Sequence, residues 1–277
     1  MFDPVVQDTK YYNSEFPPSM IPIKFKSGNN NLLGTYFTAQ GSDPKPTVLL
    51  LHGFPGNEVN FDIAHSIRRN KWNVLVFHYS GSWGSEGTYS WSDSINDTQS
   101  AINYLKNCDQ RIFRIDKSKI VLVGHSLGGF NAFYNSLQFD EIKNVAWLAG
   151  FNFGYFANFI KDVEEFRKIT LDTMRPSASI VNGTTAEELL NEMTLNSEKW
   201  NLLNYIDKLK SKKLLMIGAE YDSVAPNEIH FDPLLKALED TAAVDLTHDK
   251  LTTGHSFSSR RIELQRILIT WLNKIVW

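Results

Sequence analysis

A serine flanked by glycines is the part of this sequence best suited to chemistry. The hexapeptide Gly124-His125-Ser126-Leu127-Gly128-Gly129 follows an apolar run at 119–123 and opens a segment of helical period. A strand that turns sharply into a helix leaves no room for side chains two residues before and after the serine, so small residues are needed there. The pattern Gly-x-Ser-x-Gly in this setting predicts that Ser126 is a nucleophile.

A serine hydroxyl is a poor nucleophile at neutral pH and needs two partners. A histidine takes its proton, and a carboxylate fixes the tautomer of that histidine and stabilises its charged form. In an open parallel sheet these partners lie in loops just after strands. Asp222 follows the apolar run 214–217, and His255 follows the last predicted strand and precedes the terminal helix. We therefore predict Ser126, Asp222 and His255 as the catalytic residues.

Two of these assignments have a rival nearby. Glu220 could replace Asp222 as the acid, but it sits closer to its strand and points less freely into a cleft. His248 could replace His255, but it falls at or just beyond the end of the last predicted strand. His52 and His125 border the two glycine-containing motifs, and we expect them to pack or to brace loops.

The elements that must position these residues follow an alternating order. Short apolar runs alternate with segments of helical period, as in strands joined by crossover helices in a mainly parallel sheet. The first two of eight predicted strands flank a Gly-Asn turn and should form an antiparallel hairpin. The predicted strands are 21–25, 32–39, 48–51, 74–79, 120–123, 145–148, 214–217 and 242–246. The predicted helices are 61–69, 94–106, 127–137 and a terminal one over 264–275.

The stretch 150–205 interrupts this alternation and has no convincing strand of its own. We interpret it as an inserted helical unit with a turn near Gly183. As a lid over a substrate pocket it would present rings to an apolar ligand, but we expect roughly two of every three rings to pack the insertion against the sheet. Its aromatic residues include Phe151, Phe153, Tyr155, Phe156, Phe159, Phe166 and Trp200.

Together these features resemble the α/β-hydrolase family. The nucleophile follows the fifth strand, the acid the seventh and the histidine the eighth, in the family's order. Leu51-His52-Gly53-Phe54-Pro55-Gly56 ends the third strand as the family's histidine-glycine oxyanion loop does. The resemblance implies that the backbone N–H groups of Phe54 and Leu127 bind the oxyanion. It also implies an α/β fold with an eight-stranded, mostly parallel sheet, a core of 1–149 and 206–277, and a helical cap of 150–205.

A narrower likeness, to serine aminopeptidase-like and prolyl-oligopeptidase-like hydrolases, lies in 79–87. Those enzymes often carry arginine where this chain has Ser80. The glycines in this stretch do not have the spacing of a dinucleotide loop, so we expect a tight loop beside the active site and no cofactor. No cluster of His, Cys, Asp and Glu has metal-ligand spacing, so we expect no metal.

Composition sets limits on the partners. The 277 residues carry a formal charge of −3 with no long run of one sign, so neither nucleic acid nor an anionic membrane is an expected partner. The single cysteine, Cys108, cannot form an intrachain disulfide. No leader-like N-terminus and no membrane-spanning apolar run is evident, so we expect a cytoplasmic protein.

The sequence therefore predicts a serine hydrolase that needs no cofactor and acts on a small-molecule ester or a short peptide. An ester or thioester of a small or apolar acyl group is the first hypothesis, because the insertion is aromatic. An aminopeptidase or amidase with the same triad is the alternative, as is a hydrolase-like binding protein with low turnover. The sequence does not indicate the oligomeric state.

Overall fold

The computed structural model describes residues 2–241 and 244–277 and is built on one central sheet. Its eight strands lie in the order β1-β2-β4-β3-β5-β6-β7-β8. The first two strands form an antiparallel hairpin, β2 is antiparallel to β4, and all further neighbours are parallel. The strands are β1 (Ser19–Ser27), β2 (Asn30–Thr38), β3 (Lys45–Leu51), β4 (Asn73–Phe77), β5 (Ile115–His125), β6 (Asn144–Leu148), β7 (Lys213–Ala219) and β8 (Asp245–Leu251).

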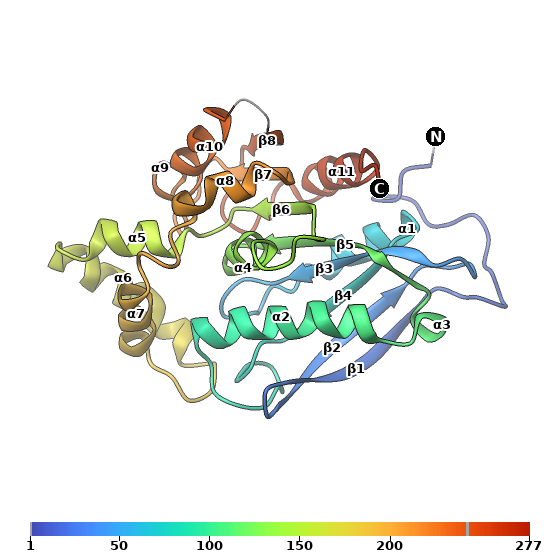
Figure 1. Ribbon diagram of the computed structural model, residues 1–277, viewed down its shortest axis with the longest axis horizontal. Helices are drawn as coiled ribbons and strands as arrows, with labels where there is room; N and C mark the ends of the chain where they lie inside the picture. The colour runs from blue at the N-terminus through green and yellow to red at the C-terminus, as the bar shows by residue number, and fades with distance from the viewer. Residues whose placement is uncertain (1, 242–243) are drawn as a thin grey trace.

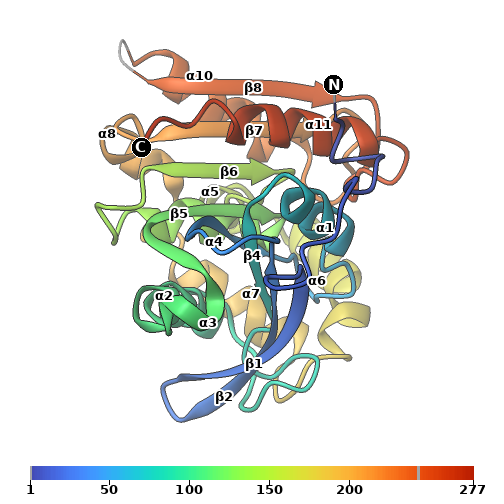
Figure 2. The ribbon, with the colours of Figure 1, turned by 90° about the vertical axis from the view of Figure 1, so that its right-hand side faces the viewer.

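Helices cover both faces of this sheet (Figure 1, Figure 2). Helices α2, α4 and α10 pack on one face, and α1 and α11 pack on the other. Along β3, Leu49 and Leu51 face the first group while Val48 and Leu50 face the second, because successive side chains of a strand point to opposite faces. The flanking helices are α1 (Phe61–Arg69), α2 (Trp91–Asn107), α4 (Leu127–Ser136), α10 (Asp232–Glu239) and α11 (Arg261–Leu272), with the short α3 (Gln110–Phe113), α8 (Ile206–Leu209) and α9 (Asn227–His230).

The predicted fold class is confirmed, and most predicted elements are present with shifted ends. The last strand differs most, because the prediction placed it at 242–246 and β8 spans Asp245–Leu251. Residues 242 and 243 of that prediction lie outside the described part of the chain. β8 is an edge strand whose pattern is largely exposed, so its residues are polar and gave no apolar run to detect.

The segment between β6 and β7 contains helices as its regular elements. They are α5 (Phe153–Ile160), α6 (Glu164–Ala178), α7 (Ala186–Leu195) and the short 3-10 helix η1 (Leu202–Tyr205), followed by the short α8. Glu192 of α7 accepts hydrogen bonds from the backbone N–H groups of Trp91 and Ser92, both over 2.8 Å. These two donors belong to the first turn of α2, where N–H groups have no partner within the helix. Helix α7 is thereby fixed to the helix layer of the sheet.

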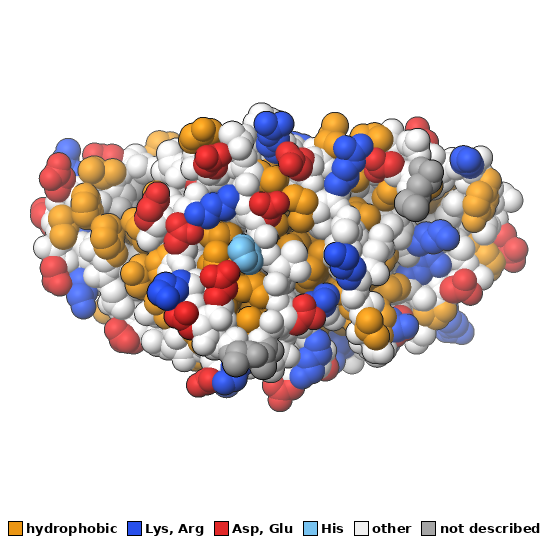
Figure 3. Space-filling model, turned by 90° about the horizontal axis from the view of Figure 1, so that it is seen from above, with side chains coloured by type: hydrophobic (Ala, Val, Ile, Leu, Met, Phe, Trp, Pro, Cys, Tyr) orange, Lys and Arg blue, Asp and Glu red, His pale blue; other side chains and the backbone are white. Residues whose placement is uncertain are grey.

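Among the described residues, no helix combines the length and the apolar character needed to cross a bilayer. Figure 3 shows acidic and basic side chains interspersed over the face seen from above, without a large area of one sign. Hydrophobic side chains appear at the end of the molecule where α5 lies in Figure 1.

Candidate active site

Ser126 occupies the sharp turn between β5 and α4 in a strained backbone conformation. Its φ is 58° and its ψ is −121°, a combination that costs a non-glycine residue free energy. A Cβ atom added to Gly124 would lie 1.8 Å from the carbonyl oxygen of Gly128, and one added to Gly128 would lie 2.1 Å from that of Leu51. The two glycines of the motif are therefore required by close backbone contacts, as the sequence pattern predicts.

Backbone hydrogen bonds hold this strained turn in place. The Ser126 N–H donates to the carbonyl of Leu148 at the end of β6, over 3.0 Å. The Ser126 carbonyl accepts from Gly129 over 2.9 Å and from Phe151 over 3.2 Å. The nucleophile candidate is therefore tied to its own helix and to the neighbouring strand, and only 8% of the residue is exposed.

Asp222 and His255 come together from the ends of β7 and β8. Nδ1 of His255 donates to Oδ2 of Asp222 over 2.8 Å, and the Asp222 side chain is 1% exposed. The second oxygen, Oδ1, accepts from the N–H groups of Val224 and Ala225 over 2.9 and 2.7 Å. This carboxylate is therefore fixed on both sides and holds the His255 ring with Nε2 free for proton transfer.

The rival residues lie elsewhere. Glu220 is exposed, and its N–H pairs with the carbonyl of Leu251. His248 is an exposed residue within β8, and its Nε2 lies 3.1 Å from Oε1 of Glu239. The prediction that His248 falls at or beyond the end of its strand was wrong, because β8 runs further than the apolar pattern indicated.

In the part of the chain that the structure describes, no hydrogen bond joins Ser126 Oγ to His255. His125, the residue before Ser126, connects the serine turn to the loop that carries His255. Its Nε2 donates to the carbonyl of His255 over 2.9 Å, and the two ring centroids lie 4.9 Å apart. Burial lowers the pKa of His125 to about 3, so this brace is neutral at physiological pH. Bonds between a nucleophile and its base are often long before substrate binds.

The two predicted oxyanion donors are free. Among the described residues, neither the N–H of Phe54 nor that of Leu127 donates a hydrogen bond. Leu127 is the first residue of α4, whose N-terminus favours negative charge. A Cβ atom on Gly53 would lie 2.9 Å from Cβ of Ser126, so the loop that carries Phe54 runs directly against the serine. Both amides are therefore available beside Ser126.

His52 braces the loop that carries Phe54. Its Nδ1 donates to the carbonyl of Gly53 over 2.7 Å, and burial lowers the pKa of the ring to about 3. A Cβ on Gly56 would lie 2.6 Å from the His52 ring, so that turn depends on glycine, with a φ of 101°. Trp83 connects the loop 79–87 to the loop that carries Phe54, since its Nε1 donates to the carbonyl of Pro55 over 2.7 Å.

The loop that contains Ser80 is held by a buried carboxylate. Asp97 of α2 accepts from the N–H of Ser80 over 2.6 Å and from its hydroxyl over 3.1 Å. Burial raises the pKa of Asp97 to about 6, even though these donors counteract the effect. Residues 79–87 form a tight loop, as predicted, with Gly81 at a φ of 70°.

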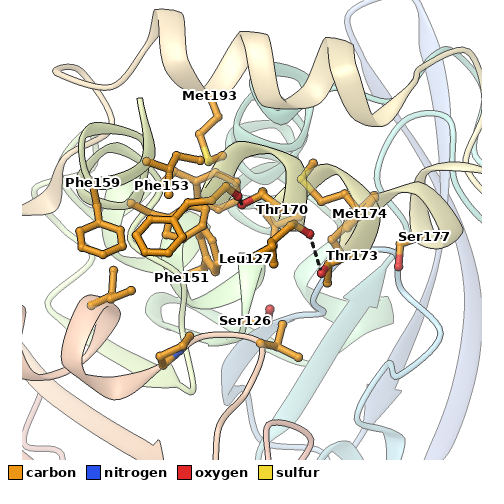
Figure 4. Close-up of a pocket in the computed structure, with 18 of the residues that line it drawn as sticks. Ser126, Leu127, Phe151, Phe153, Phe159, Thr170, Thr173, Met174, Ser177 and Met193 are labelled. Atoms are coloured by element: carbon orange, nitrogen blue, oxygen red, sulfur yellow. Dashed lines mark hydrogen bonds between the residues drawn. The ribbon is translucent and has the colours of Figure 1, made fainter. Parts of the chain in front are cut away.

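An apolar cavity of about 490 Å³ opens from Ser126 (Figure 4). None of the described side chains that line it is charged. Six of them are phenylalanines: Phe54, Phe151, Phe153, Phe156, Phe159 and Phe166. Five of the seven aromatic residues noted in 150–205 line the cavity, and three of these five, Phe151, Phe153 and Phe156, also belong to or pack against the hydrophobic core. These rings gather here because the segment folds back over the carboxyl ends of the strands.

The contribution of α6 to this cavity was not predicted from the residue pattern. Residues at helical spacing line it: Phe166, Ile169, Thr170, Thr173, Met174 and Ser177. The spacing of three and four was visible in the sequence, but hydroxyl residues made up half of the face and masked its apolar character. Within 2–241 and 244–277, no group of three or more His, Cys, Asp or Glu side chains is arranged to hold a metal ion.

Comparison with known proteins agrees with this fold. A family model described as alpha/beta hydrolase fold matches residues 46–176. YfhR of Escherichia coli K12, an uncharacterized protein, is 26% identical over 225 residues, which are 79% of this chain and 68% of that protein. WAV2 of Arabidopsis thaliana, an alpha/beta hydrolase domain-containing protein, is 26% identical over 189 residues, 65% of this chain and 54% of that one.

Solved structures resemble the fold at low identity. An acylaminoacyl peptidase of Pyrococcus horikoshii superposes with a TM-score of 0.69 and 16% identity, covering 94% of this chain and 42% of that one. The esterase Pf2001 of Pyrococcus furiosus gives 0.64 and 16%, covering 94% and 92%. The sheet order, the serine turn, the matched family model and the solved structures agree that the chain has the α/β-hydrolase fold.

Proposed function

We propose that this protein is a serine hydrolase that cleaves a carboxylic ester or thioester with an apolar acyl group. The observation that carries the proposal is an uncharged cavity that starts at Ser126, beside the hydrogen-bonded pair of Asp222 and His255. The segment 150–205 acts in this proposal as the predicted cap, because its helices supply most of the cavity wall.

The residues act in the order that their chemistry requires. Ser126 Oγ attacks the acyl carbonyl carbon while Nε2 of His255 takes the hydroxyl proton, and Asp222 stabilises the resulting imidazolium. The amides of Phe54 and Leu127 donate to the oxyanion, where one such donor typically contributes about 3 kcal/mol. The intermediate collapses and the alkoxide or thiolate leaves with the proton from His255. Water, deprotonated by the same ring, then releases the acid from the acyl-enzyme.

The character of the cavity favours this substrate over a peptide with a free amino terminus. An aminopeptidase must bind an α-ammonium group, and burying that charge without a carboxylate is costly. No described lining residue is acidic. The amidase hypothesis therefore ranks second, for substrates with an uncharged acyl part. The uncharged cavity does not argue against a hydrolase-like protein that binds such a molecule with little turnover.

Labelling with a fluorophosphonate probe tests the nucleophile. Wild-type protein should be labelled, Ser126→Ala should not, and His255→Ala should react far more slowly, because the hydroxyl loses its base. Equal labelling of wild type and Ser126→Ala would overturn the assignment. Turnover of short p-nitrophenyl esters and of aminoacyl anilides then separates the substrate classes, and faster anilide cleavage would reverse their ranking.

A further inference from the structure

The cavity has an exposed mouth and a closed end. At the mouth, Phe159, Phe166 and Ile169 are 47%, 40% and 55% exposed. At the closed end, Met193 and Trp91 are 1% and 4% exposed. A chain bound at Ser126 can extend freely toward the mouth but meets a wall in the other direction. The cavity is therefore asymmetric about the candidate nucleophile.

Met193 stands across the cavity from Ser126, with Phe153 beside it (Figure 4). Phe153 is 3% exposed and packs against Trp91, with ring centroids 4.9 Å apart. These three side chains come from α2, α5 and α7, so the closed end is formed where the segment 150–205 meets the helix layer of the sheet. The Met193 thioether lies at the closed end of the cavity, across from Ser126.

This wall is fixed in position. Glu192, next to Met193, accepts from the backbone of Trp91 and Ser92, and the Trp91 indole N–H donates to the carbonyl of Leu189 over 2.9 Å. Two charge-assisted bonds and one indole bond therefore join α7 to the first turn of α2. Because a closely packed interior tolerates little extra volume, this fixed wall sharply limits the length of a ligand in the closed end of the cavity.

The two threonines of the cavity wall do not require a polar occupant. Thr170 and Thr173 donate their hydroxyl protons to the carbonyls of Phe166 and Ile169, over 2.8 and 2.9 Å within α6. Their donors are already satisfied, so an apolar chain leaves no hydroxyl proton of these two residues unpaired. None of the lining side chains that the structure describes carries a charge that would hold an ionic group.

We propose that the acyl chain of the substrate fills the closed end and that Met193 determines the longest chain accepted, while the alcohol or thiol part lies toward the mouth. The inference rests on the proposed function. It assigns the substrate class as esters or thioesters of unbranched, uncharged acyl chains of limited length. Methionine suits this position because its unbranched, apolar side chain fills irregular gaps in a packed interior.

The test is a chain-length profile of kcat/KM with straight-chain p-nitrophenyl esters from acetate to palmitate. In wild type, kcat/KM should fall about tenfold or more once the chain exceeds the space. Met193→Ala should move this limit to longer chains and Met193→Trp to shorter ones. Met193→Leu, with similar volume, should leave the limit unchanged, and Met20→Ala on exposed β1 is the matched control. Where the alanine variant unfolds, Met193→Val should move the limit in the same direction.

Binding separates failure of this inference from failure of the proposed function. Ser126→Ala, alone and combined with each Met193 variant, is titrated with the same uncleaved esters by calorimetry. If the longest ester that binds changes with the residue at position 193, the inference is supported. If wild type also cleaves no ester, only the proposed function is overturned. Cleavage with one common limit in the alanine, tryptophan and wild-type proteins would overturn the inference and leave the function standing.

Discussion

Two helices contribute to the same cavity, and they are held in opposite ways. All ten residues of α4, which follows Ser126, are buried, and the helix packs on the sheet. Of the fifteen residues of α6, only Ala178 is buried. Helix α6 is joined to α7 by an ion pair between Arg175 and Glu187, at the surface. The side of the cavity that carries Ser126 is rigid, whereas the side formed by α6 is lightly held.

This difference separates reactivity from selectivity. Nucleophile and oxyanion donors must keep fixed positions to lower the barrier, so close packing around them is functionally necessary. A wall that only contacts an apolar group can change its side chains at little cost in folding free energy. Substitutions that disturb the close packing on the α4 side should therefore affect both rate and stability, whereas those on the exposed surface of α6 should affect substrate binding alone.

The largest effect is expected for Ser126→Ala. It removes the proposed nucleophile, so kcat for a p-nitrophenyl ester should fall by about 10⁵- to 10⁶-fold, with the melting temperature nearly unchanged. Ser179→Ala, at the exposed end of α6, is the matched control and should keep kcat. Comparable losses in both variants would contradict the division between the two helices.

The next effect is on folding. Alanine normally stabilises a helix relative to glycine by about 1 kcal/mol, but a Cβ on Gly128 would lie 2.1 Å from the Leu51 carbonyl oxygen. Gly128→Ala should therefore reduce the free energy of unfolding by about 3 kcal/mol and abolish activity, because β3 and α4 must separate. Urea denaturation measures the change, and a stabilised variant would show that the turn is looser than its contacts indicate.

A pH dependence of stability should arise in the buried helix layer, at Asp97 of α2. Burial raises the pKa of this carboxyl from 3.8 to about 6, so between these values the folded protein keeps a proton that the unfolded chain loses. The free energy of unfolding should fall as pH rises through this window, by about 3 kcal/mol for this group. Asp97→Asn should remove that decrease. Urea denaturation at about pH 4 and about pH 7 measures the free energy of unfolding of both proteins. The same change between the two pH values in wild type and Asp97→Asn would refute the prediction.

The smallest effect on stability is expected on α6. Ile169 lines the mouth and is 55% exposed, so Ile169→Ser should change the free energy of unfolding by less than about 0.5 kcal/mol. Its lost apolar contact should raise KM several-fold for an apolar ester with kcat retained. Steady-state kinetics and urea melts of one preparation give both values. A clear loss of stability would mean that α6 is part of the core.

Local patterns were enough to predict much of the molecule. Apolar alternation located seven of the eight strands approximately, and the glycines around Ser126 indicated the turn. The order of Ser126, Asp222 and His255 along the chain predicted residues that follow β5, β7 and β8, as observed. The ends of β8 could not be predicted, because an exposed edge strand carries polar residues that periodicity does not detect.

The sequence by itself determined the type of sheet, the strained serine and the identity of its candidate partners, because each depends on local residue pattern and on the order of strands. Only the tertiary structure decided that five insertion rings line a cavity, that His125 holds the His255 loop, and that Met193 closes the space opposite Ser126. These facts depend on contacts between residues far apart in the chain. Such contacts are set by how whole elements pack, which no local pattern records.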